Sequence, residues 1–135
     1  KHTNFSMWWF AQGLTDFAVA LRPYIPDPLI SVIIPCFNHA KYITEALESV
    51  VRQTFTSWET IIIDDRSPDR CGEHAAEWAK QRGAEVESRV RVITNQANVG
   101  LAESRNHGIR AAKGVWICAL DPDDMIEPGY FAAAV

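Results

Sequence analysis

Three aspartates stand within four residues of one another at the end of an apolar segment. Asp121, Asp123 and Asp124 follow the run from Trp116 to Leu120, and Pro122 stiffens the turn between them. Carboxylates this close repel one another, so solvent, hydrogen-bond donors or a cation must offset the repulsion. Hard divalent cations such as Mg²⁺ or Mn²⁺ take oxygen ligands and often bind a phosphate-bearing substrate too. The run predicts a metal-diphosphate site, with an acidic surface turn as the alternative because Asp and Pro are ordinary turn residues.

The elements that position these aspartates are predicted to be alternating strands and helices. Continuous apolar, β-branched runs predict strands covered on both faces, and apolar residues at spacings of three and four predict helices. Strands joined through helices imply right-handed crossovers and an open, mostly parallel sheet with helices on both faces, which is an α/β fold. The predicted strands are residues 29–34, 59–63, 89–93 and 115–120, and the helices are residues 41–53, a segment through 75–79 that Gly83 can end, and residues 101–112.

The carboxyl ends of these strands should carry the chemistry, because ligands of open α/β sheets bind there. Asp64 and Asp65 follow the second strand, so they should share an edge with the three aspartates that follow the fourth. Five carboxylates at one edge need a counter-charge. The candidates are a divalent metal and Arg105, near the start of the third helix, where the helix dipole also favours anions.

The first strand is not followed by a phosphate-binding glycine loop. Neither GxxxxGK[ST] nor GxGxxG is present, which leaves a metal as the expected holder of phosphates. Phe37 could stack on a planar base, with core packing as the alternative. Asp64 or Asp65 could accept a hydrogen bond from a base N–H, and we expect one of the pair to brace the following turn only.

The N-terminal residues 1–28 are predicted to lie outside the domain formed by residues 29–135. Apolar residues from Met7 to Leu21 recur at helical spacing, and Pro23, Pro26 and Pro28 then force an extended linker. Packing on the domain is the first expectation for this helix. Contact with a partner or a membrane surface is the alternative.

Composition limits the classes of partner and compartment. The 135 residues carry a net charge of −4 without a run of Lys or Arg, which argues against nucleic acid. Three cysteines without CxxC spacing suggest neither a disulfide framework nor a zinc site, so we expect a reducing, cytoplasmic compartment. His39, His74 and His107 are not spaced as a ligand set and suit a surface role. We expect a soluble chain because no segment reaches the roughly 20 apolar residues of a spanning helix.

From about Ile30 to Tyr130 the chain resembles the family 2 glycosyltransferases of the GT-A fold, which is Rossmann-like. The segment ISVIIPCFNHAKYITEALESVVRQTF is similar to the family's opening strand and helix, and WETIIIDDRSPD to its second strand with paired aspartates. NVGLAESRNHGIRAAKGVWICALDPDDMIEP resembles the segment that ends in the family's DxD motif. The order and spacing of these segments make the resemblance specific.

The resemblance implies a nucleotide-diphosphate-sugar donor, with a UDP-sugar favoured, and a Mn²⁺ or Mg²⁺ cofactor. It implies that Pro35, Phe37, Asn38, Asp64 or Asp65, and Arg105 bind the nucleotide. Asp121 and Asp123 match the DxD pair, and Asp124 stands where some relatives supply the metal ligand, so the choice among the three stays open. Transfer in the family inverts the anomeric centre by direct attack of the acceptor hydroxyl.

Direct attack needs a general base, and the family's base comes from the part of the domain beyond the DxD motif. We assign no catalytic base in this chain, expect it beyond Val135, and expect the isolated chain to be inactive. Two alternatives stay open, a non-catalytic module of the same fold and a receiver-type signalling domain. The position of Asp64 after the second strand, not the first, disfavours the receiver.

Overall fold

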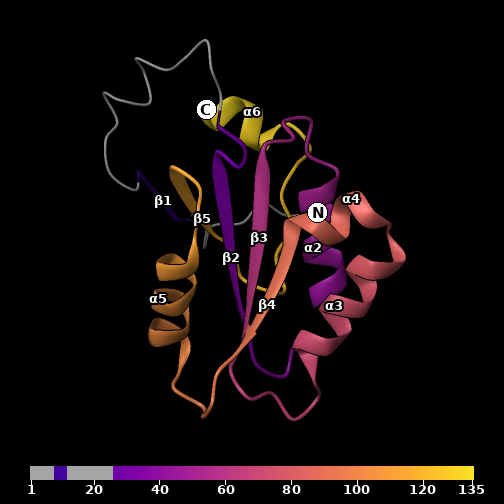
Figure 1. The fold of residues 1–135 in the computed structure, drawn as a ribbon, viewed down its shortest axis with the longest axis vertical. Helices are drawn as coiled ribbons and strands as arrows, with labels where there is room; N and C mark the ends of the chain where they lie inside the picture. Colours follow the sequence, from indigo (N-terminus) through magenta and orange to yellow (C-terminus); the bar gives the residue numbers. More distant parts are fainter. Residues whose placement is uncertain (1–7, 12–25) are drawn as a thin grey trace.

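The structure, a computed structural model, describes residues 8–11 and 26–135. Its centre is a sheet with the strand order β1-β5-β2-β3-β4 (Figure 1). The strands are β1 (Trp8–Ala11), β2 (Ile30–Cys36), β3 (Trp58–Asp64), β4 (Val90–Thr94) and β5 (Trp116–Ala119). The register of β2, β3, β4 and β5 is parallel, whereas β1 runs antiparallel to β5. The predicted open, mostly parallel sheet is confirmed.

The helices cover both faces of this sheet. They are α2 (Ile43–Val51), α3 (Cys71–Gln81), α4 (Ala84–Arg89), α5 (Leu101–Ala111) and α6 (Tyr130–Ala134). In Figure 1, α2, α3 and α4 lie on one side of the sheet and α5 on the other.

Alternation along β2 divides the core between the two faces. Val32 and Ile34 pack with residues of α2 and α3, whereas Ile33 belongs to the cluster packed against Ile109 of α5. All seven residues of β2 and all seven of β3 are buried. This explains why apolar residues of the central strands point to both faces, because each face of the sheet is covered.

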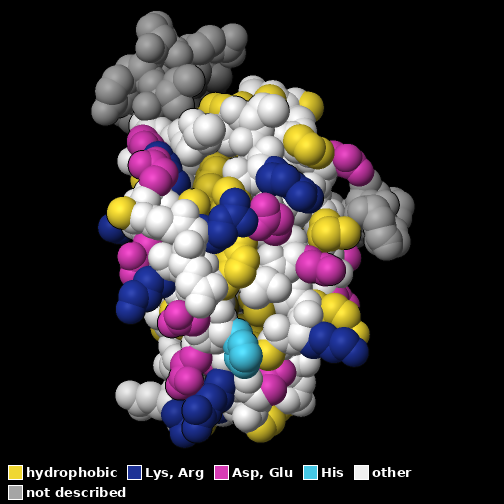
Figure 2. Space-filling view, turned by 90° about the vertical axis from the view of Figure 1, so that its right-hand side faces the viewer, with side chains coloured by type: hydrophobic (Ala, Val, Ile, Leu, Met, Phe, Trp, Pro, Cys, Tyr) yellow, Lys and Arg dark blue, Asp and Glu magenta, His cyan; other side chains and the backbone are white. Residues whose placement is uncertain are grey.

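The face that carries α3 and α4 shows acidic and basic side chains interspersed (Figure 2). Arg82 of α3 contacts Glu48 of α2, and Arg89 lies 2.9 Å from Asp27. Such partly exposed pairs contribute about 0–1 kcal/mol each. The two signs of charge are therefore mixed on this face, and no patch of a single sign is seen in this view.

Two predictions at the level of elements are corrected. The helix predicted from Met7 to Leu21 is wrong over Trp8–Ala11, which form strand β1; the other residues of that prediction lie outside the described residues. The four residues of β1 extend the sheet by pairing with the edge of β5. This strand pairing prevails over the helical tendency that the spacing of the apolar residues indicates. Helix α4 was not predicted, because none of its residues is buried and its sequence carries no apolar stripe.

Candidate nucleotide-diphosphate site

A pocket of about 400 Å³ opens at the carboxyl ends of β2, β3 and β5. It is lined by Pro35 and Cys36 at the end of β2, Phe37 and His39 after β2, Asp65 after β3, Leu101 and Ser104 of α5, and Asp121, Pro122 and Asp123 after β5. Four segments far apart in the sequence thus meet at one edge of the sheet, as the topology of parallel strands requires. The pocket has an aromatic wall at Phe37 and carboxylates at Asp65, Asp121 and Asp123.

Asp64 and Asp65 have different roles, although they are adjacent. Asp64 accepts hydrogen bonds from the backbone N–H of Ser67 (2.8 Å) and of Gly72 (2.9 Å). A side chain at position 72 would collide with this carboxylate, so the close approach needs glycine. Asp64 is absent from the pocket wall and takes the bracing role expected of one of the two aspartates.

Asp65 is held by the loop that follows β4. Its Oδ1 accepts from Asn95 Nδ2 (2.9 Å) and from the backbone N–H of Val99 (2.8 Å), and its Oδ2 accepts from the N–H of Gly100 (2.9 Å). Burial by itself would raise the pKa of Asp65, but these hydrogen bonds and the nearby His107 lower it below its usual value. Asp65 is therefore an anion fixed at the pocket wall.

The loops after β2 and β3 are joined to each other. The N–H of Asn38 donates to Ser67 Oγ (2.8 Å), and the N–H of Ala40 donates to Asp69 Oδ2 (3.0 Å). Asn38 itself has φ 62, a left-handed conformation that Asn tolerates better than most residues. Asn38 thus shapes the loop that carries Phe37, but its side chain does not line the pocket.

Cys36 and Cys71 form a disulfide, with their Cα atoms 6.6 Å apart. The expectation that the cysteines indicate no disulfide is wrong for this pair, because 35 residues of sequence separate two positions that the fold makes adjacent. The bond ties the end of β2 to the start of α3. Cys118 takes no part in the disulfide and is buried.

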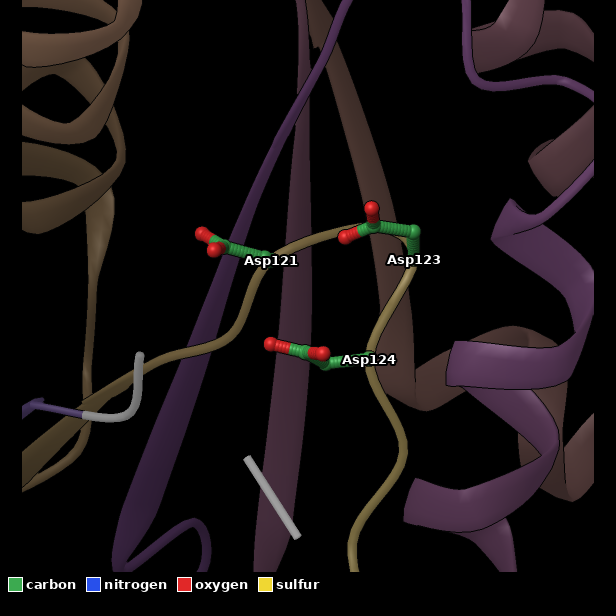
Figure 3. Close-up of side chains that lie close together, drawn as sticks. All are labelled: Asp121, Asp123 and Asp124. Carbon is green, nitrogen blue, oxygen red and sulfur yellow. The ribbon is translucent and has the colours of Figure 1, made fainter. Parts of the chain in front are cut away.

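The three aspartates of the acidic run form one cluster after β5. Ligand oxygens of Asp121, Asp123 and Asp124 all lie within 4.8 Å of one another. Figure 3 shows the side chains of Asp123 and Asp124 projecting from the loop toward the same side. Carboxylate oxygens at this spacing fit a hard divalent cation, so the residues present suit Mg²⁺ or Mn²⁺.

Arg105 is the counter-charge of this cluster. Its Nη2 lies 3.1 Å from Asp121 Oδ1, and both side chains are about three-quarters buried, with exposed fractions of 26% and 31%. Arg105 does not line the pocket, and its buried Nε has no hydrogen-bond partner. Arg105 therefore pairs with the acidic run without lining the pocket.

The far end of the acidic loop is anchored by Gln53, a buried residue after α2. Its Nε2 donates to the carbonyl of Glu127 (2.6 Å), and its Oε1 accepts from the N–H of Phe131 (2.9 Å). The loop of Asp121, Asp123 and Asp124 is thus fixed at both ends, by β5 and by Gln53. Sequence reasoning missed this role, because a single Gln at the end of a helix gives no signal of its contact 74 residues away.

The family model described as Glycosyl transferase family 2 matches residues 31–135. The chain belongs to this family. It is 42% identical over 104 residues to the uncharacterized glycosyltransferase EpsJ of Bacillus subtilis (strain 168), which is 77% of this chain and 28% of EpsJ. It is 37% identical over 99 residues to the glycosyltransferase GlyG of Streptococcus pneumoniae, which is 73% of this chain and 31% of GlyG.

The solved structures agree with this assignment. The crystal structure of S. aureus TarS 1-349 matches with a TM-score of 0.69 and 30% identity, covering 78% of this chain and 30% of TarS 1-349. The same protein in complex with UDP-GlcNAc matches with a TM-score of 0.68 and 31% identity, covering 78% and 29%. The resemblance to the family and the expected GT-A fold are confirmed. The family match also removes the receiver-type alternative.

The predicted site residues divide into two groups. The pocket wall includes Pro35, Phe37, Asp65, Asp121 and Asp123, and it does not include Asn38, Asp64, Arg105 and Asp124. His39, for which a surface role was expected, also lines the pocket. Leu101 and Ser104 line the pocket without having been predicted. The signal that could have found them is Gly100, whose φ of 94 turns the chain directly into α5 beside the strand ends.

Proposed function

We propose that this chain forms the donor-binding part of an inverting, metal-dependent glycosyltransferase. The transferase would move a sugar from a nucleotide-diphosphate sugar to an acceptor hydroxyl. The observation that carries the proposal is the pocket that joins Phe37 and Asp65 to Asp121 and Asp123 in one cavity. An aromatic ring and an anionic hydrogen-bond acceptor suit a nucleoside base, and the aspartate cluster suits a cation bound to a diphosphate.

Each group in the pocket has a role in this proposal. The exposed ring of Phe37 stacks on the base, and Asp65 accepts a hydrogen bond from a base N–H with the spare acceptor capacity of its carboxylate. UDP is the favoured nucleotide, since uracil presents such an N–H and since TarS, a structural relative, has been solved with UDP and with UDP-GlcNAc.

Asp121, Asp123 and Asp124 are the residues that would hold Mn²⁺ or Mg²⁺. Such a cation, when bound, neutralises charge on the leaving diphosphate. Arg105 orients Asp121 through their ion pair and keeps part of the cluster's charge balanced. Gln53 holds the loop that carries all three carboxylates.

The general base is not assigned to any described residue. The three clustered aspartates are assigned to the cation, and Asp65 is assigned to the N–H of the nucleoside base. The chain spans 28% and 31% of the lengths of EpsJ and GlyG, so we propose that the base and the acceptor pocket belong to the rest of such a protein. The 135 residues alone should bind donor without transferring sugar.

Two observations bear on where the chain resides in the cell. No helix among the described residues is long and apolar enough to cross a membrane. We propose the cytoplasm as the compartment. The cysteines do not support this proposal, because Cys36 and Cys71 form a disulfide. A membrane contact through an N-terminal helix has no support over Trp8–Ala11, where the chain is a strand.

Calorimetric titration with UDP-, GDP- and dTDP-sugars, with and without Mn²⁺, tests the proposal. We expect Mn²⁺-dependent binding of one nucleotide class, UDP first. An Asp121→Asn/Asp123→Asn variant should lose the Mn²⁺ dependence, and Glu87→Gln, which changes an exposed carboxylate of α4 outside the pocket, is the control. Binding of no nucleotide sugar by a folded wild-type chain would favour the non-catalytic module.

A further inference from the structure

A buried polar chain runs from the pocket to the surface of α5. Asn95, which is 5% exposed, lies between Asp65 and His107. Its Nδ2 contacts Asp65 Oδ1 at 2.9 Å and Ser104 Oγ at 3.0 Å, and its Oδ1 lies 2.8 Å from His107 Nδ1. On its other side, His107 Nε2 lies 3.3 Å from Glu103 Oε2.

The chemistry of Asp65 fixes the orientation of the Asn95 amide. An ionised carboxylate only accepts hydrogen bonds, so the group that faces it must be the NH₂ of Asn95. The opposite orientation would set the amide oxygen against the carboxylate oxygen and would break the bond to Asp65. The Oδ1 of Asn95 therefore faces His107.

The orientation of Asn95 in turn fixes the proton of His107. Because Asn95 Oδ1 is an acceptor, the ring nitrogen that faces it must be an N–H, so Nδ1 carries a proton. Glu103 Oε2 is also an acceptor, and it is shared with Arg110, whose Nη2 lies 3.0 Å away. The ring of His107 is thus held between Asn95 on the pocket side and the Glu103–Arg110 pair on the solvent side.

We propose that His107 is a positioning residue for the donor pocket: its Nδ1–H holds the Asn95 amide, and Asn95 aims the Asp65 carboxylate at the nucleoside base. This inference rests on the proposed function for the identity of the ligand. The charged groups around the ring are Asp65, Glu103 and Arg110, from the loop after β3 and from α5 itself.

Loss of His107 leaves the buried Oδ1 of Asn95 without its donor. The amide can then rotate or admit water, and either change shifts the carboxylate that it holds, because Asn95 supplies one of the three hydrogen bonds on Asp65. Val99 and Gly100 donate to the same carboxylate, so their amide proton shifts report its position.

The test compares two substitutions that differ in one donor. His107→Asn puts an amide N–H close to the place of Nδ1, whereas His107→Leu keeps bulk without a donor. With UDP and Mn²⁺ as the probe, we expect His107→Leu to weaken binding about fivefold to tenfold, the size expected for one buried hydrogen bond. His107→Asn should stay within about twofold of wild type, and so should Glu103→Gln, which alters only the solvent side of the ring.

Nuclear magnetic resonance gives a readout that does not depend on UDP. Nδ1 of wild-type His107 should carry a proton, and His107→Leu should move the Val99 and Gly100 amide protons while His107→Asn restores them. An Nε2–H tautomer, or unchanged Val99 and Gly100 signals in His107→Leu, would overturn the inference. Equal UDP affinity for wild type and His107→Leu would overturn it as well.

A separate outcome concerns the proposed function. If wild type binds no UDP while the Nδ1 proton and the amide shifts are as expected, the proposed function fails and the positioning of Asp65 by His107 stands.

Discussion

Two adjacent aspartates illustrate how single residues divide structural and binding work. Asp64 receives two backbone donors on the side of α3, and Asp65 receives three donors on the side of the pocket. The dipeptide alone could not separate these roles, because the side chains of adjacent residues in a strand point to opposite faces and the sequence does not say which face holds the ligand.

Substitution of each aspartate should therefore have a different result. Asp64→Asn sets an NH₂ group against one of two backbone N–H donors, so we expect its free energy of unfolding to fall by about 1–3 kcal/mol. Its UDP affinity, measured by calorimetry well below the unfolding temperature, should change by less than about threefold. Asp65→Asn should weaken UDP binding by at least about tenfold, since the anion that receives the base N–H is lost. Similar binding losses in both variants would contradict the assignment of Asp65 to the pocket.

At the scale of elements, the disulfide joins β2 to α3 and closes a loop that includes α2 and β3. Cross-linking positions 35 residues apart restricts the unfolded chain. A dithiol reductant should lower the free energy of unfolding of wild type by about 2–4 kcal/mol. Chemical denaturation with and without the dithiol measures this difference.

Two cysteine variants serve as controls for that experiment. Cys36→Ala/Cys71→Ala should be insensitive to the dithiol. Cys118→Ala should keep the full sensitivity of wild type, because burial raises the pKa of the Cys118 thiol and keeps it an unreactive, protonated side chain. Wild-type stability that the dithiol leaves unchanged would contradict a stabilising role of the bond.

The elements that the sequence predicts well are those whose signal is local. Strands β2 and β3 are rich in apolar, β-branched residues, and the place of Asp64 and Asp65 at the carboxyl end of β3 follows without any knowledge of contacts. What the sequence misses depends on tertiary structure. The Cys36–Cys71 bond, the Arg105–Asp121 pair and the anchoring by Gln53 each join segments that only the folded sheet makes adjacent.

At the scale of the whole molecule, β1 covers the outer edge of β5. It pairs Trp8–Ala11 with residues 116–119, so that the backbone N–H and C=O groups of β5 do not face solvent along this edge. An uncovered edge beside a buried central strand is a template for pairing with another copy. The residues of the pocket, by contrast, all belong to segments after residue 34.

Removal of β1 should therefore change association and leave nucleotide binding intact. Proline at position 10, which lies opposite Ile117, fixes φ and is disfavoured within a strand, so Phe10→Pro should weaken β1 and release the edge of β5. We expect Phe10→Pro and a chain that begins at residue 26 to self-associate at concentrations where wild type does not, as measured by light scattering after size-exclusion chromatography. Both should bind UDP and Mn²⁺ within about twofold of wild type.

A Phe10→Leu variant controls for the loss of the ring, because it retains the backbone N–H. Monomeric behaviour of the shortened chain equal to that of wild type would contradict the protective role of β1, since the edge of β5 would then be exposed without consequence.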